Sequence, residues 1–135
     1  MTPILADTGF LVALYAPREE SHERAWRYLT EHRHPLASVS AVVVETCFFL
    51  SPVQKLEFLR WVRHGALAIF ETPPAAYQEL ERLLHKYRDR NIDFADAALV
   101  WLADQLGARS LLTGDRADFQ ILRLKGKRRF ELIDW

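Results

Sequence analysis

The feature that most constrains the fold is an alternation of short apolar runs with longer segments of helical character. The apolar runs fit buried strands, and they lie at residues 4–6, 35–38, 67–70, 111–113 and 130–133. Helices are expected at residues 10–15, 19–31, 41–50, 52–62, 74–87 and 94–106. Ser40 is expected to cap the third of these helices and Asp93 the last, which Gly107 ends. In the helix at 74–87, the inward-facing residues are expected to be Tyr77, Leu80, Leu83 and Leu84. Strands that alternate with helices predict an α/β fold, with a central parallel sheet of about five strands and helices on both faces.

Length and composition predict one globular domain that spans residues 1–135. Half of the residues are hydrophobic, which excludes a mainly disordered chain. A single cysteine, Cys47, excludes a disulfide scaffold. No apolar run approaches the roughly 20 residues of a membrane span, and the first residues lack the basic start of a signal peptide. We therefore expect a cytoplasmic protein with no membrane segment.

Four acidic residues are not explained by local structure. Asp7 ends the first expected strand and Asp115 follows the fourth, so both lie at the same sheet edge if these strands are parallel. Glu45 sits in a segment that is apolar on every face, so we expect it to be buried, where an unpaired carboxylate is costly. Asp96 falls in the first turn of another apolar helix. A role in a turn, cap, salt bridge or helix dipole is open to each acid alone, so the case for a shared site depends on all four.

Acidic side chains around one pocket suit a hard divalent cation. Carboxylate oxygens favour Mg²⁺ or Mn²⁺, and no spacing of Cys or His in the chain favours zinc. Such cations, singly or in pairs, support phosphodiester hydrolysis, because they activate water and stabilise the attacking and leaving oxygens. The acids therefore favour metal-dependent cleavage of a phosphodiester.

The motifs that carry these acids resemble those of PIN-domain ribonucleases, in particular the VapC-like toxins of type II toxin–antitoxin pairs. In chain order the motifs are Leu5-Ala6-Asp7-Thr8-Gly9, Val44-Glu45-Thr46, Asp93-Phe94-Ala95-Asp96-Ala97-Ala98-Leu99-Val100 and Leu112-Thr113-Gly114-Asp115-Arg116-Ala117-Asp118-Phe119. Their order, spacing and strand–helix context run along the whole chain, and no acid of the set is missing.

The resemblance implies a Mg²⁺- or Mn²⁺-dependent endoribonuclease, dimeric and silenced by a small antitoxin protein. Carried over by position, the catalytic and metal-binding residues are Asp7, Glu45, Asp96 and Asp115. Thr8 and Thr113 would supply hydroxyls that orient carboxylates or water, and Asp93 and Asp118 would be auxiliary.

The charge balance fits an acidic site on a basic surface. The net charge is zero, which excludes a uniformly basic nucleic-acid binder. Without the four site acids the remaining charge is 18 − 14 = +4. Basic residues cluster at residues 123–129 and just before the third motif, where they could hold RNA phosphates by charge. The candidate RNA contacts are Arg88, Arg90 and Arg116, and Arg116 comes first because it adjoins Asp115.

Three alternatives remain open. Asp7-Thr8-Gly9 also matches aspartic proteases, but one copy would need a homodimer, and the helical periodicity and the other acids would then go unexplained. A PIN-like binding module with a silent site is a second reading, and a housekeeping RNA-processing nuclease is a third. Apolar residues at 48–49 and 61–62 could contribute to an antitoxin or dimer surface.

Overall fold

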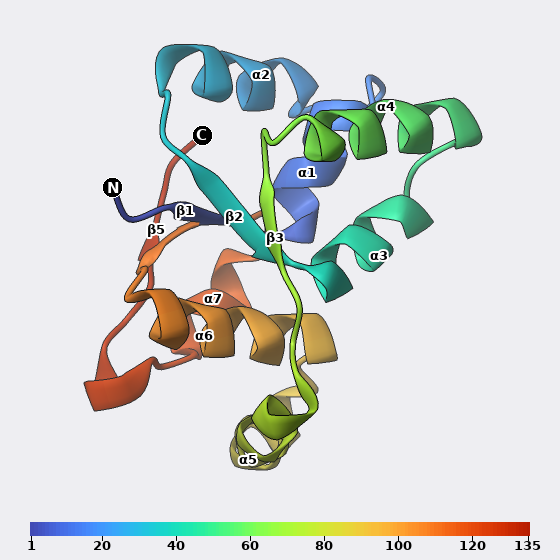
Figure 1. Ribbon diagram of the computed structural model, residues 1–135. Coiled ribbons are helices and arrows are strands. Elements are labelled where there is room, and N and C mark those ends of the chain that lie inside the picture. The colour runs from blue at the N-terminus through green and yellow to red at the C-terminus, as the bar shows by residue number, and fades with distance from the viewer.

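The computed structural model describes residues 1–135 and has a parallel sheet at its centre (Figure 1). The strands are β1 (Ile4–Ala6), β2 (Leu36–Val39), β3 (Ala68–Phe70), β4 (Ser110–Leu112) and β5 (Glu131–Leu132). Their order in the sheet is β3-β2-β1-β4-β5, and every neighbouring pair is parallel. The central strand pairs Leu5 with Ala37 on one side and with Leu111 on the other. The expected parallel sheet is confirmed.

Helices cover both faces of the sheet, as predicted. They are α1 (Thr8–Tyr15), α2 (His22–Glu31), α3 (Ser40–Phe48), α4 (Pro52–Arg63), α5 (Tyr77–Lys86), α6 (Phe94–Leu106) and α7 (Arg116–Ile121), with short 3-10 helices η1 (Pro74–Ala76), η2 (Arg88–Arg90) and η3 (Lys125–Lys127). In Figure 1, α1, α2 and α4 lie above the sheet, and α5, α6 and α7 lie below it. α3 contacts both α1 and α6, so it joins the two helical layers. None of these helices is both long and apolar enough to cross a membrane.

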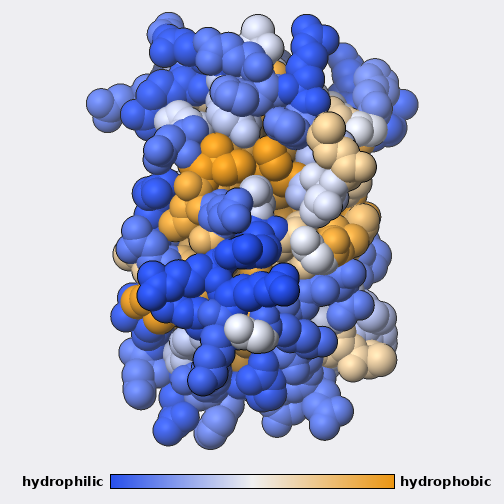
Figure 2. Space-filling view, turned by 90° about the vertical axis from the view of Figure 1, so that its left-hand side faces the viewer, coloured by the Kyte–Doolittle hydropathy of each residue, from blue (hydrophilic) through white to orange (hydrophobic).

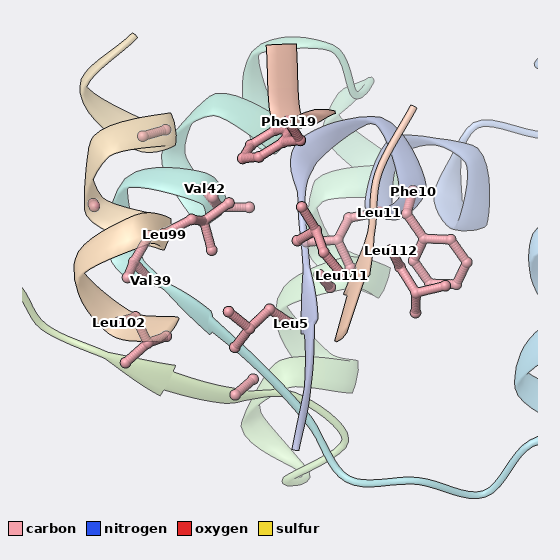
Figure 3. Close-up of a cluster of buried hydrophobic side chains, with 14 of the residues drawn as sticks. Leu5, Phe10, Leu11, Val39, Val42, Leu99, Leu102, Leu111, Leu112 and Phe119 are labelled. Carbon is pink, nitrogen blue, oxygen red and sulfur yellow. The ribbon is translucent and has the colours of Figure 1, made fainter. Parts of the chain in front are cut away.

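The hydrophobic core fills the spaces between the sheet and both helical layers. Figure 3 shows Leu99 and Leu102 of α6 on one side of β1, and Phe10 of α1 beside Leu112 of β4 on the other. All four side chains are at most 1% exposed. Burying a Leu or Phe side chain contributes roughly 1.5–3 kcal/mol. The two layers therefore hold the ends of β1 and β4 in fixed positions.

Several helix ends differ from the sequence prediction. The helices expected to begin at residues 10 and 19 begin at Thr8 and His22, and the helix after β2 differs at both ends. Ser40 was expected to cap the helix that follows β2, but Val39 holds the N-cap position. The Ser40 hydroxyl instead donates to Glu71 Oε2 at 2.9 Å. The helix then ends at Phe48, two residues before the predicted end. The cap at Asp93 and the stop at Gly107, which has a φ of 64°, are as expected.

The segment at 74–87 was expected to be one helix with Tyr77 turned inward. It begins instead with the 3-10 helix η1, and the Tyr77 side chain is 52% exposed. Leu80 and Leu83 are buried as predicted. Helix α7 was not predicted, because its six residues are too few to show a helical period.

Candidate active site

β1 and β4 end side by side, and an acid follows each of them. The backbone N–H of Asp7 donates to the carbonyl oxygen of Leu112 at 2.9 Å, which ties the two strand ends together. Asp115 follows β4 after two residues and caps α7. Helices α3 and α6 supply Glu45 and Asp96. All four acids line one cavity of about 410 Å³, which is where a parallel α/β sheet places its ligands.

The lining of this acidic cavity carries seven carboxylates and no Lys, Arg or His side chain. It consists of Asp7, Thr8, Gly9, Val12, Glu19, Glu45, Phe49, Asn91, Asp93, Asp96, Gly114, Asp115 and Asp118. A hollow of about 940 Å³ along α5 is larger but holds no comparable set of acids. Of the seven, only Asp118 has an ion pair, with Arg90. The other six carboxylates repel one another, so the cavity favours a cation.

Asp7 is the most deeply buried acid of the cavity, with 6% of its surface exposed. Its Oδ2 accepts a hydrogen bond from the Thr113 hydroxyl at 2.9 Å. Burial, and to a smaller degree the negative charges of Glu45 and Asp115, raise the pKa of Asp7, and the hydrogen bonds from Thr8 and Thr113 lower it. The net pKa is about 6. Two opposing influences therefore hold this carboxyl close to half-ionised near pH 6.

Thr113 connects two of the acids. Its Oγ1 donates to Asp7 and accepts the backbone N–H of Asp115 at 2.9 Å. Asp115 Oδ1 in turn accepts the backbone N–H of Asp118 at 3.2 Å, so this exposed acid also caps α7. Desolvation raises the pKa of Asp115, the Asp118 charge adds to the rise, and Arg90 opposes it. The Thr113 hydroxyl, which was expected to orient a carboxylate, is hydrogen-bonded to that of Asp7.

Asp96 is half-buried at the start of α6. Its Oδ2 accepts the backbone N–H of Asp93, the helix-capping residue, at 3.1 Å. Desolvation, and to a smaller degree the charges of Asp7, Asp93 and Glu45, raise the pKa of Asp96, and the hydrogen bond from the Asp93 N–H lowers it. The net pKa is about 7. Asp96 therefore ionises at an unusually high pH for an aspartate.

Glu45 corrects the expectation of full burial. The side chain is half-buried, because α3 packs with only part of its surface against the core. Val42 and Thr46 are buried, whereas Val44 is 59% and Phe48 is 81% exposed. An apolar sequence on every face of a helix does not by itself enclose the helix.

Thr8 leaves a polar atom without a partner at the cavity. Its Oγ1 is buried and makes no hydrogen bond, and the residue lines the acidic cavity. Buried hydroxyls are nearly always hydrogen-bonded. The atom is therefore placed to serve a ligand or water held among the acids.

Glu19 and Asn91 also line the cavity, and the sequence analysis missed both. Glu19 lies between α1 and α2, where an acid is ordinary, and no motif marks it. Asn91 has a φ of 53°, in the left-handed region that Asn tolerates better than most residues. In the sequence, only the position of Asn91 just before a capped helix could have indicated that it lies near the site.

The three arginines proposed as RNA contacts have different surroundings. Arg90 Nη2 pairs with Asp118 Oδ1 at 3.2 Å, next to the acidic cavity. Arg116 Nη1 pairs with Asp134 Oδ1 at 3.4 Å and lines a separate pocket. Arg88 donates to the carbonyl of His85 and lines neither pocket. The basic segment 123–129 precedes β5, so it lies toward the opposite edge of the sheet from the acids.

The acids share a cavity, but their carboxylates do not surround one common centre. No group of three or more Asp, Glu, His or Cys side chains is positioned around a single centre as a ready ligand set. The donor chemistry nevertheless fits a hard cation, because every charged group in the lining is a carboxylate.

Comparison with known proteins agrees with this arrangement. The model of the PIN domain matches residues 4–124. Ribonuclease VapC26 from Mycobacterium tuberculosis is 31% identical, over 96% of this chain and 99% of the relative.

Two solved structures share the fold. VapC20 from Mycobacterium tuberculosis, a toxin that cleaves the sarcin-ricin loop, matches with a TM-score of 0.74 and 18% identity, over 83% of this chain and 91% of its own. VapBC2 from Rickettsia felis, bound to a DNA fragment from its promoter, matches with a TM-score of 0.67 and 16% identity, over 97% of this chain and 98% of its own. The chain belongs to the PIN domain family and, within it, to the VapC-like ribonucleases.

Proposed function

We propose that residues 1–135 form one nuclease domain that hydrolyses RNA phosphodiesters with Mg²⁺ or Mn²⁺, and that it is the toxin of a toxin–antitoxin pair. One observation carries the proposal: four acids from four separate segments of the chain line one cavity at the carboxyl ends of β1 and β4. The chain's likeness to ribonuclease VapC26 supports the choice of RNA as substrate.

Asp7, Glu45, Asp96 and Asp115 would hold one or two ions. When bound, the cation would activate water and stabilise charge on the phosphate oxygens. The raised pKa values of Asp7 and Asp96 support this role, because a bound divalent cation would offset the burial, and the smaller charge repulsion, that raise them. Ion binding would therefore release protons near neutral pH.

The remaining polar groups would position the reacting ones. Thr113 holds Asp7 through Oγ1, and Asp93 holds Asp96 through its backbone N–H. The unpartnered Thr8 hydroxyl would orient water or a phosphate oxygen. No histidine lines the cavity, so proton transfer would fall to the carboxylates and water.

A partner surface beside the cavity supports control by an antitoxin. Exposed apolar side chains gather on α3, α4 and the turn between them, and they are Val44, Phe48, Phe49, Val53, Leu56 and Leu59. Phe49 also lines the acidic cavity. A protein docked on this apolar surface would reach the acids, and a basic side chain from it would compete with the cation. Part of the same surface would serve a homodimer.

The test uses purified protein, total cellular RNA and Mn²⁺. We expect discrete RNA fragments from the wild-type protein, and none with EDTA or from the Asp96→Asn variant. His64→Asn is the matched control, because His64 is exposed and lies outside the cavity. Cleavage that persists in EDTA would overturn metal dependence and would favour a protease-like site or another site that works without a metal.

The alternative of a binding module with a silent site is separated by metal affinity. A silent site predicts neither cleavage nor a change in melting temperature with Mn²⁺. A housekeeping nuclease predicts the same cleavage chemistry without growth arrest when the chain is expressed alone. Growth arrest that requires Asp96 would favour the toxin.

A further inference from the structure

A second pocket adjoins the acidic cavity across Gly114. It has a volume of about 220 Å³ and brings together Arg24 from α2, Arg116 from α7 and Trp135 at the end of the described chain. Gly114 lines both this pocket and the acidic cavity, so the two are neighbours on one surface. We call it the arginine pocket.

The boundary between the two pockets is low because it is made by glycine. Gly9 and Gly114 are both exposed, and their backbones lie close together. A Cβ on Gly9 would meet Gly114 N at 3.1 Å and Gly114 Cα at 3.2 Å, which leaves no comfortable room for a side chain. A chain-like ligand can therefore cross from one pocket to the other without meeting a side chain at these two positions.

Both arginines are available to a ligand. Arg24 forms no ion pair, and its guanidinium lies 5.6 Å from the ring centre of Trp135. Arg116 has one ion pair, a single contact at 3.4 Å to Asp134, whose side chain is 98% exposed. Surface pairs of this kind are weak. A phosphate that accepts two hydrogen bonds from a guanidinium would displace Asp134.

The floor of the pocket is held in place. The Trp135 indole N–H donates to the carbonyl oxygen of Thr113 at 3.1 Å. Its ring packs edge-on against Phe10, with the ring centres 5.0 Å apart. Phe10 is fully buried, so the indole is anchored to the core and holds Arg24 above the carboxyl end of β4.

The charges of the arginine pocket indicate which class of ligand it would bind. The seven carboxylates in the acidic cavity outnumber the charges of one or two bound ions, so basic side chains on either side would add to the affinity for an RNA strand. On the Asp118 side, Arg90 already has an ion pair. On the Gly114 side, the arginine pocket offers two guanidinium groups. Figure 2 shows an apolar band on the face turned toward β5, with hydrophilic residues above it, below it and in its middle.

We propose that the arginine pocket binds a phosphate of the RNA strand next to the phosphodiester held at the acidic cavity, with Arg24 and Arg116 as its ligands. The proposal depends on the proposed function only for the identity of the strand as RNA. Asp134 competes with that phosphate for Arg116, so it weakens binding.

The experiment measures binding separately from cleavage. A fluorescein-labelled, single-stranded RNA of randomised sequence is titrated with the Asp96→Asn protein in Mn²⁺, and anisotropy gives the dissociation constant. In that background we expect Arg24→Ala and Arg116→Ala each to weaken binding by about threefold to tenfold, and to lower the salt slope by about 0.7 for each lost contact. Asp134→Asn should strengthen binding by about twofold to threefold. Arg24→Lys and Arg116→Lys should restore part of the loss, because they keep the charge.

Arg27→Ala is the matched control, because Arg27 is also exposed on α2 but lines neither pocket. Equal effects of Arg24→Ala, Arg116→Ala and Arg27→Ala would overturn the pocket, as would an RNA affinity too weak to measure. Arginine-dependent binding by a wild-type protein that cleaves no RNA would instead remove the proposed hydrolysis and leave the pocket standing. Unchanged melting temperatures of the variants exclude unfolding as the cause.

Discussion

Helices α3 and α6 have similar apolar sequences and each carries one site acid, yet their surroundings differ. α6 is enclosed, with seven buried residues between Ala95 and Ala103. α3 buries only Val42 and Thr46 and leaves Phe48 81% exposed. Similar composition therefore produces a core helix in one place and a half-covered helix in the other. Packing of α6 in the core therefore holds Asp96 in place. Glu45 on α3 instead lies beside an exposed apolar surface that a partner could bind.

The largest expected effect separates the two helices by stability. Leu102→Ala on α6 should lower the free energy of unfolding by about 2–5 kcal/mol, because it opens a cavity in a closed core. Val44→Ala on α3 should lower it by less than about 0.5 kcal/mol, because the side chain is largely exposed. Urea unfolding followed by circular dichroism measures both. Equal losses would show that α3 is as enclosed as α6.

The second effect concerns pH. The pKa of Asp96 is about 7 in the fold and that of Asp7 about 6, against about 3.9 for an unfolded aspartate. The folded state therefore binds protons more tightly, so these groups stabilise the metal-free protein at low pH, and that stability is lost as pH rises from 4 to 7. Asp96→Asn should stabilise the metal-free protein by about 1–3 kcal/mol at pH 8.

The matched test is the same substitution at pH 4, where the stabilisation should vanish because both residues are uncharged. Glu45→Gln on α3 should change the stability less than Asp96→Asn does at pH 8, because α3 buries only Val42 and Thr46 and packs with only part of its surface against the core. Thermal unfolding in EDTA measures each difference. A stabilisation by Asp96→Asn that is the same at both pH values would contradict the ionisation argument.

The third effect asks whether the two helices contribute alike to ion binding. Mn²⁺ at ten times its dissociation constant should stabilise the wild-type protein by about 1.4 kcal/mol, a rise of about 3–6 °C in melting temperature. Asp7→Asn and Asp96→Asn should abolish the rise. If Glu45→Gln also abolishes it, the two helices act together, whereas an unaltered rise and full turnover in Glu45→Gln would remove α3 from the ligand set.

The smallest effect tests the open face of α3. Phe48→Ser should change the free energy of unfolding by at most about 0.5 kcal/mol, since the ring is 81% exposed. It should weaken self-association or antitoxin binding, which sedimentation velocity and titration with a candidate antitoxin would detect. A large loss of stability with no change in association would show that the ring serves the fold itself.

The sequence predicted those parts of the molecule that depend on local pattern. Period and apolar runs located the five strands, and Asp93 was identified as the residue that caps α6. The expected parallel order predicted that Asp7 and Asp115 lie at one edge, because the rule for parallel sheets is topological.

The parts that failed depend on packing between distant segments. The half-burial of Glu45 reflects what α3 lacks on its outer face, which its own sequence does not encode. Glu19 reaches the cavity from the turn between α1 and α2, and no local pattern marks it. Arg116 adjoins Asp115 in the chain but lines a different pocket, because the start of α7 directs the two side chains apart.

The hydroxyl of Thr113 also fixes where a proton can sit on Asp7. A hydroxyl has one hydrogen, and Thr113 gives its hydrogen to Asp7 Oδ2 while its oxygen receives the N–H of Asp115. A protonated Oδ2 would be a weaker acceptor for the Thr113 hydrogen, so a proton taken up by Asp7 is favoured on Oδ1. The chain of donors from Asp115 to Asp7 thus has a single direction, and protonation of this carboxyl leaves it intact.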